Sequence, residues 1–145
     1  MSYDRILCID YGDARVGIAV SDLLGITAQG VETIKNKGKK VLFERLKELI
    51  NYYSPKTIVI GMPKNMDGTI GFRGEKTIKF AEELKSIYDG KIDFCDERLS
   101  TVSALMTLNE TNTRGEKRKN VVDTVAAAVI LQTYMDGLKN VSKKE

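Results

Sequence analysis

The 145-residue sequence contains no histidine, and it has only two prolines and two cysteines. The absence of histidine excludes Ser-His-Asp triads, general-base catalysis by imidazole and nearly every zinc site with a histidine ligand. Any chemistry must therefore use carboxylates, lysines, hydroxyls or a hard metal ion. The cysteines, Cys8 and Cys95, both lie in apolar runs, where we expect buried free thiols rather than a disulfide.

Long hydrophobic runs are also absent. The longest extends only from Val125 to Leu131, far short of a membrane span. The apolar stretch near the N-terminus is short and follows Asp4 and Arg5, which is not typical of a signal peptide. We therefore expect a cytoplasmic protein. Its net charge of +3 is mild but uneven, which allows a local basic patch.

The length of 145 residues predicts a single domain, which we place over residues 1–139 and expect to be followed by a disordered tail over residues 140–145. The expected elements are two strands within 7–22, a strand over 26–34, a helix over 40–53, a strand over 57–61, a helix over 71–88, a strand over 92–95 and helices over 100–108 and 120–138. In the helix over 71–88, the residues that should face inward are Ile78, Ala81, Leu84, Ile87 and Tyr88. This order implies an α/β fold with a mixed five-stranded sheet, in which two parallel crossover strands extend an antiparallel three-strand meander and helices flank the sheet.

A carboxylate ends the apolar run of the first strand. Asp10 follows Leu7, Cys8 and Ile9 and precedes a tight turn at Gly12. Burying an ionised carboxylate without a partner is strongly unfavourable. Asp10 must therefore lie at a solvent-facing strand end, pair with a base or bind a cation, and our working hypothesis is the cation.

Two further acids occur where a ligand site is expected. Glu97 follows the second parallel strand, and ligands of such sheets bind at the carboxyl ends of the parallel strands; alone, Glu97 could be a surface acid paired with Arg98. Asp123 could complement the helix dipole in the first turn of its helix. Alternatively, the small side chains of Ala126 and Ala127 could let that helix bring Asp123 against the strand ends.

Taken together, the three acids predict a metal site. Carboxylates without histidine are the ligands of Mg²⁺ or Mn²⁺ rather than of zinc. One such ion, or a pair, can polarise a phosphodiester and generate hydroxide from water. The hypothesis is therefore that Asp10, Glu97 and Asp123 are metal ligands and catalytic residues in the hydrolysis of a nucleic-acid backbone.

Basic residues adjoin all three acids, which favours a polyanionic substrate. A charge run alone is usually a solvated face, but beside a metal ligand it can hold phosphates against the metal. The residues expected to bind substrate are Gly12, Arg15, Arg98, Arg114, Lys117, Arg118 and Lys119.

Four motifs occur in order along nearly the whole chain. They begin at Asp10, Gly61, Asp96 and Lys119 and read D-x-G-x-x-R-x-G-x-A-x-S-D, G-M-P-x-N-M-D-G-T, D-E-R-L-S-T and K-x-x-x-D-x-x-A-A. Together they resemble the YqgF/RuvX family, described as Holliday junction resolvases and as nucleases that process the 5′ end of pre-16S ribosomal RNA. Phe72 departs from the family pattern, in which proline is common at that position.

The resemblance implies an RNase H-like fold, Mg²⁺ or Mn²⁺ as cofactor, and Asp10, Glu97 and Asp123 as the catalytic acids. We therefore expect a metal-dependent endonuclease that acts on structured RNA, with precursor 16S rRNA as the leading substrate. The alternatives are a resolvase of four-way DNA junctions, expected to be a homodimer, a noncatalytic rRNA-binding assembly factor, and an actin-like phosphate-binding domain. A fourth acidic ligand, common in this fold class, would come from Asp13, Asp22, Asp67 or Asp96.

Overall fold

The computed structural model describes the backbone of residues 4–99 and 115–144, and the side chains of residues 4–99 and 124–138. The predicted helix over 100–108 lies outside the described residues. The strands and helices, in chain order, are β1 (Ile6–Tyr11), β2 (Arg15–Ser21), β3 (Ala28–Lys35), α1 (Lys39–Tyr53), β4 (Thr57–Met62), α2 (Phe72–Leu84), β5 (Lys91–Asp96), the 3-10 helix η1 (Glu97–Leu99) and α4 (Gly115–Lys144).

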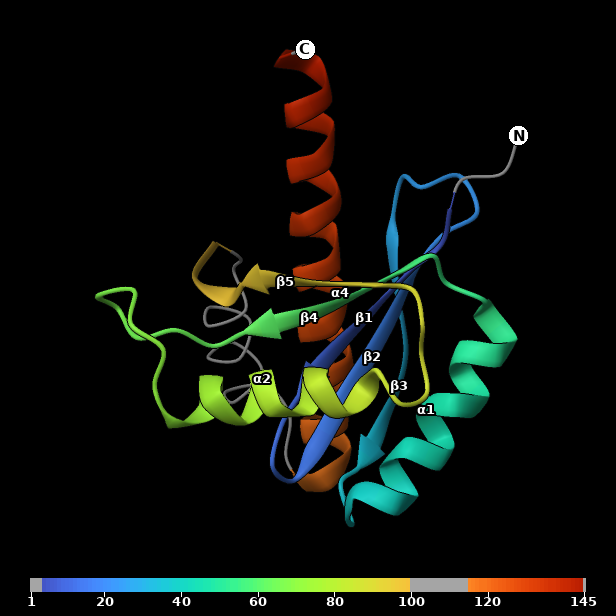
Figure 1. Cartoon of the computed structure of the whole chain (residues 1–145), viewed down its shortest axis with the longest axis vertical. Helices are drawn as coiled ribbons and strands as arrows, with labels where there is room; N and C mark the ends of the chain where they lie inside the picture. The colour runs from blue at the N-terminus through green and yellow to red at the C-terminus, as the bar shows by residue number, and fades with distance from the viewer. Residues whose placement is uncertain (1–3, 100–114, 145) are drawn as a thin grey trace.

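The five strands form one mixed sheet, as the sequence predicted, and the structure gives their order as β3-β2-β1-β4-β5. β1 pairs antiparallel with β2, and β2 with β3, whereas β4 runs parallel to both β1 and β5. β1 is therefore the central strand. The carboxyl ends of the three parallel strands lie along one side of the sheet, which we call the carboxyl edge (Figure 1).

Helices cover both faces of this sheet, with α1 and α2 on one face and α4 on the other (Figure 1). Side chains alternate along β1, so the strand contributes to two separate cores. Leu7 and Ile9 pack with α1 and α2, whereas Cys8 packs with Ala127 and Ile130 of α4. All five side chains are fully buried, which explains why β1 reads as an almost continuous apolar run.

The inward face of α2 differs from the prediction. Ala81 is buried as expected, but Ile78 is 38% exposed, and Thr77 and Phe80 are buried instead. The ring of Phe80 stacks on Tyr11 of β1, with 4.3 Å between ring centroids. An aromatic side chain buries more apolar surface than isoleucine and stacks on another ring, so Phe80 determines which side of the helix faces the sheet.

The last helix, α4, is longer than the predicted range of 120–138. It begins at Gly115, and residues 140–144, expected as a disordered tail, continue the helix to Lys144. Asp123 is therefore about two turns from the helix start, too far inside to act mainly on the helix dipole. Figure 1 shows α4 crossing behind the sheet and extending past it. Within the described part of the chain, no helix is long and apolar enough to cross a membrane.

Candidate active site

Asp10 lies at the carboxyl end of the central strand. β1 pairs with β4 as far as Ile9 and Ile60, so the next residues along the two strands, Asp10 and Gly61, are neighbours. Adjacent strands are about 4.8 Å apart. Because side chains alternate along a strand, Asp10 lies on the same face as Cys8, the face that α4 covers.

Glu97 reaches the same point from β5. It is the first residue of η1, directly after β5, and its side chain folds over Gly61 of the intervening strand β4. A Cβ atom added to Gly61 would lie 2.9 Å from Glu97 Oε1 and 2.9 Å from Cδ1 of Ile130. Gly61 therefore leaves the space that the carboxylate occupies, and the carboxylate is carried across β4 toward Asp10.

The charges of Asp10 and Glu97 both affect the pKa of the Cys8 thiol, which lies on the same face of the sheet. As predicted, Cys8 and Cys95 are buried free thiols. Burial raises the pKa of Cys8 well above its ordinary value, and the charges of Asp10, Cys95 and Glu97 raise it further. The thiol therefore stays protonated, which excludes Cys8 as a nucleophile in this site.

The third acid, Asp123, belongs to α4, and its side chain lies outside the described set. The neighbouring residues show how α4 is oriented. Ala126 and Ala127 are buried against the sheet, and the hydroxyl of Thr124 is 2.6 Å from that of Thr33 on β3. Position 123, one turn before the alanines, therefore lies on the sheet-facing side of the helix.

The structure thus brings Asp10 and Glu97 to one edge of the sheet and places position 123 on the helix that covers the same face. Among the side chains that are described, no three acids, cysteines or histidines are grouped so as to hold a metal ion. The hypothesised ligand set remains a prediction because its third member, Asp123, is not among those side chains.

The four candidates for a fourth ligand each have a local partner. The pairs are Asp96 with Arg98, Asp13 with Lys76, Asp67 with Thr69, and Asp22 with the backbone of Ile26 and the hydroxyl of Thr27. Asp22 follows β2 at the opposite end of the sheet from Asp10, since β1 and β2 are antiparallel. Each of these acids therefore has a structural contact of its own.

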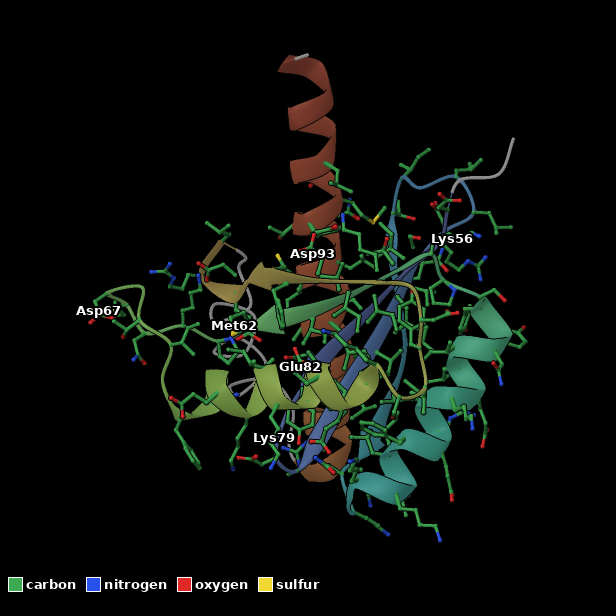
Figure 2. All side chains as sticks on the ribbon, in the orientation of Figure 1. Lys56, Met62, Asp67, Lys79, Glu82 and Asp93 are labelled. Atoms are coloured by element: carbon green, nitrogen blue, oxygen red, sulfur yellow. The ribbon has the colours of Figure 1, made fainter. Side chains whose placement is uncertain are left out.

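Arg98, predicted to bind substrate, holds a loop. Its Nη2 and Nε atoms donate to Asp96 Oδ2 at 2.7 and 3.1 Å, and these hydrogen bonds lower the pKa of the Asp96 carboxyl. Its Nη1 points at the carbonyl oxygens of Asn65 and Met66, 3.5 and 3.4 Å away. Arg98 therefore ties the β4–α2 loop (residues 63–71) to the end of β5; Figure 2 labels Asp67 at the outer tip of this loop.

Replacing Arg98 with alanine should loosen the β4–α2 loop, because the carboxylate of Asp96 and two loop carbonyls lose the guanidinium group that donates hydrogen bonds to them. We expect amide hydrogen exchange over residues 65–69 to become at least about tenfold faster, whereas global stability should fall by no more than about 1 kcal/mol at this exposed pair. Arg45→Ala is the matched control, since Arg45 is equally exposed and forms ion pairs with Glu32 and Glu48 away from the loop. Unchanged exchange in Arg98→Ala would contradict the tethering role.

The turn after Asp10 requires a glycine. A Cβ on Gly12 would lie 2.5 Å from the carbonyl oxygen of Arg15. The side-chain amide of Asn36 donates to the carbonyl of Gly12 at 3.0 Å, and the backbone N–H of Asn36 donates to Ala14. The turn is therefore held firmly beside Asp10, and Asn36 is a supporting residue that the sequence analysis did not identify.

The remaining basic candidates lie around this turn and at the start of α4. Arg15 is half-buried and begins β2 opposite Lys35 of β3. The backbone of residues 117–119 forms the first turns of α4, and the corresponding side chains lie outside the described set. Arg114 falls in the part of the chain that the structure does not describe. The substrate contacts of Lys117, Arg118 and Lys119 therefore stay predictions.

Solved structures of resolvases have the same fold. The RuvC protein of T. thermophilus, solved in complex with a Holliday junction substrate, matches with a TM-score of 0.56 and 11% identity over 91% of this chain and 94% of that chain. The fowlpox virus Holliday junction resolvase matches with a TM-score of 0.53 and 16% identity over 92% and 99%. The fold is accordingly the RNase H-like fold of the RuvC-type resolvases.

Sequence comparison then gives the family. The family model described as RuvX, Holliday junction resolvase, matches residues 4–137. A "Putative pre-16S rRNA nuclease" of Clostridioides difficile strain 630 is 52% identical over 132 residues, 91% of this chain and 94% of the relative. A protein of the same name from Acetivibrio thermocellus is 51% identical over 134 residues, 91% and 95% of the two chains. The chain belongs to the RuvX family, as its four motifs indicated.

Proposed function

We propose that this protein is a divalent-metal-dependent endonuclease of the cytoplasm that hydrolyses nucleic-acid phosphodiesters and processes the 5′ end of precursor 16S rRNA. The observation that carries the proposal is the carboxylate of Glu97 folded over Gly61, the neighbour of Asp10. Membership of the RuvX family and the names of its close relatives support this substrate. Asp10, Glu97 and Asp123 are the proposed catalytic acids.

The chemistry of this edge fits a hard divalent cation. Two carboxylates carried toward one point repel each other, and a cation between them would relieve that repulsion. Oxygen ligands suit Mg²⁺ and Mn²⁺, and Gly61 keeps the space around Glu97 free of a side chain. Asp10, Glu97 and Asp123 would hold the ion, which when bound would lower the pKa of water and stabilise charge on the phosphate.

The chain's own basic residues would position the substrate. Arg15 and the cations at 114 and 117–119 adjoin the proposed acids in sequence, so contacts from them to phosphates would place the backbone at the carboxyl edge. Arg98 would act indirectly, by fixing the β4–α2 loop beside the site. Gly12 would contribute by keeping the turn next to Asp10 tight.

A four-way DNA junction is the second candidate substrate, favoured by the description of the RuvX family model. The same acids would serve, but two strands would have to be cut symmetrically. A junction resolvase should therefore act as a homodimer.

Parallel cleavage assays separate these substrates. A precursor 16S rRNA fragment and a four-way DNA junction are each incubated with the protein in Mg²⁺, in Mn²⁺ and in EDTA. We expect the RNA to be cut at a defined 5′ position with either metal, no cleavage in EDTA, and an intact junction. If the junction is nicked symmetrically and the RNA stays intact, the DNA junction rather than precursor 16S rRNA is the substrate. Tight, salt-sensitive RNA binding without any cleavage would favour the assembly factor and overturn the proposal.

A further inference from the structure

An aromatic ring stands exposed at the first residue of α2. Phe72 is 71% exposed, so its ring contributes little to the hydrophobic core. The ammonium group of Lys76, one turn further along the helix, lies 4.5 Å from the centroid of the ring. This cation–π contact restrains the ring and covers part of it, while most of the ring stays open to solvent.

The helix that carries the ring covers the face of the sheet opposite to Asp10 and Glu97, but its first turns reach the β1–β2 turn that follows Asp10. α2 begins on the side of the sheet where β4 and β5 end (Figure 1). A small pocket next to the β1–β2 turn is lined by Tyr11, Gly12 and Asp13 together with Arg73 and Lys76 of α2. The basic first turns of α2 are therefore continuous with the turn that follows Asp10.

The start of α2 is also held in place. Gly74 is buried, and a Cβ added to it would lie 2.5 Å from Cγ2 of Ile70 and 3.1 Å from the carbonyl oxygen of Pro63. The helix thus packs closely against the loop that precedes it. Lys76 also forms an ion pair with Asp13 of the β1–β2 turn, with 3.2 Å between Nζ and Oδ1. Phe72 is consequently presented from a fixed position.

An exposed ring among cations matches one class of ligand. Arg73, Lys76 and Lys79 recur at every third residue of α2, with Glu75 as the acid of its first turn, and Figure 2 labels Lys79 near the middle of the helix. Nucleic acids combine a negative backbone with flat bases, and a base can stack on an aromatic ring only when its face is not covered by duplex stacking. A polyanion with an unpaired base therefore complements this surface.

We propose that Phe72 is a stacking platform for an unpaired nucleobase of the substrate strand, with Arg73 and Lys76 contacting the flanking phosphates. The proposal rests on the proposed nuclease function for the identity of the ligand as nucleic acid. It adds a requirement on the substrate, namely a single-stranded segment that extends from the cleavage position past the β1–β2 turn to the start of α2.

Fluorescence of 2-aminopurine, which stacking quenches, tests the contact directly. A short single-stranded RNA that carries the probe is titrated with the protein in EDTA, so that binding is measured without cleavage. We expect wild type and Phe72→Tyr to quench the probe, and Phe72→Leu, which keeps apolar bulk but lacks a ring, to lose the quenching. Affinity of Phe72→Leu for the single strand should fall about 5- to 100-fold, whereas binding of a fully paired duplex should change less than twofold.

Tyr52→Leu is the matched control. Tyr52 is 79% exposed in the last turn of α1, at the amino end of β4 and away from the carboxyl edge. This variant should bind and quench as wild type does. Undiminished quenching and affinity in Phe72→Leu would overturn the platform even if metal-dependent cleavage is found. Conversely, ring-dependent quenching by a protein that cleaves nothing would support the platform and contradict the proposed nuclease function.

Discussion

Replacing Asp10 with asparagine is expected to lower the rate of RNA cleavage by at least about 1,000-fold while the protein stays folded. Asparagine has nearly the same size and shape as aspartate, so the carboxyl end of β1 should keep its geometry. It lacks the negative charge that a divalent cation requires from its ligand. The rate is measured under single-turnover conditions with saturating Mg²⁺, and folding by circular dichroism and the thermal midpoint.

Asp89→Asn provides the control for this charge change. Asp89 is an exposed acid between α2 and β5, at the amino end of β5 and remote from Asp10. Its substitution should leave the cleavage rate within about twofold of wild type. RNA binding by Asp10→Asn, measured in EDTA, should be retained because the phosphate contacts come from other residues. Full cleavage activity in Asp10→Asn would rule out the proposed three-acid site.

The Gly61→Ala variant should lower both the stability of the fold, through overpacking, and the rate of cleavage, through displacement of Glu97. The added methyl group meets Glu97 Oε1 and the Cδ1 atom of Ile130, each 2.9 Å away, so both side chains must shift. Overpacking of this kind costs about 1–3 kcal/mol of stability. A carboxylate displaced by about 1 Å can cost about 100-fold in rate, and we expect a loss of that order. Urea denaturation and single-turnover cleavage measure the two effects.

A second substitution distinguishes the two contacts. Ile130→Val removes the Cδ1 atom that the new methyl group would strike. In the Gly61→Ala, Ile130→Val double variant we therefore expect much of the lost stability to return, while the cleavage rate stays low because Glu97 is still displaced. If the rate recovers together with stability, the effect of Gly61→Ala was on packing alone, and the position of Glu97 over β4 has no catalytic importance.

Most of the fold could be predicted because hydrophobic patterns decide it locally. The β-branched run of β4 indicates a strand covered on both faces, and the crossover connections indicate a mixed sheet that extends an antiparallel meander. The details that were wrong depend on distant contacts. Whether Ile78 or Phe80 of α2 faces the sheet is settled by Tyr11 of β1, which is close to α2 only in the folded chain.

The candidate site, like the fold, could be predicted where the signal is local and not where it depends on distant contacts. Asp10 could be proposed from the sequence because an acid that ends an apolar strand needs a physical reason, and the structure shows that the turn after it requires Gly12. The part played by Gly61 could not be found from periodicity, since it depends on the side chains of Glu97 and Ile130 arriving from other elements. The phosphate contact of Arg98 stays a prediction, and its hydrogen bonds to Asp96 and to the loop could not be found from the sequence pattern.

The late position of α4 in the chain has a consequence for protein synthesis. α4 supplies one of the two cores, through Ile130 and Leu131, and carries Asp123; its contacts with β3 join residues about 100 positions apart, as in the hydrogen bond from the backbone of Ala28 to Gln132. A nascent chain that ends before this helix has all five strands but lacks the proposed third acid and the cover of one sheet face. Products that end before α4 should therefore be unable to cut RNA if Asp123 is the proposed third acid.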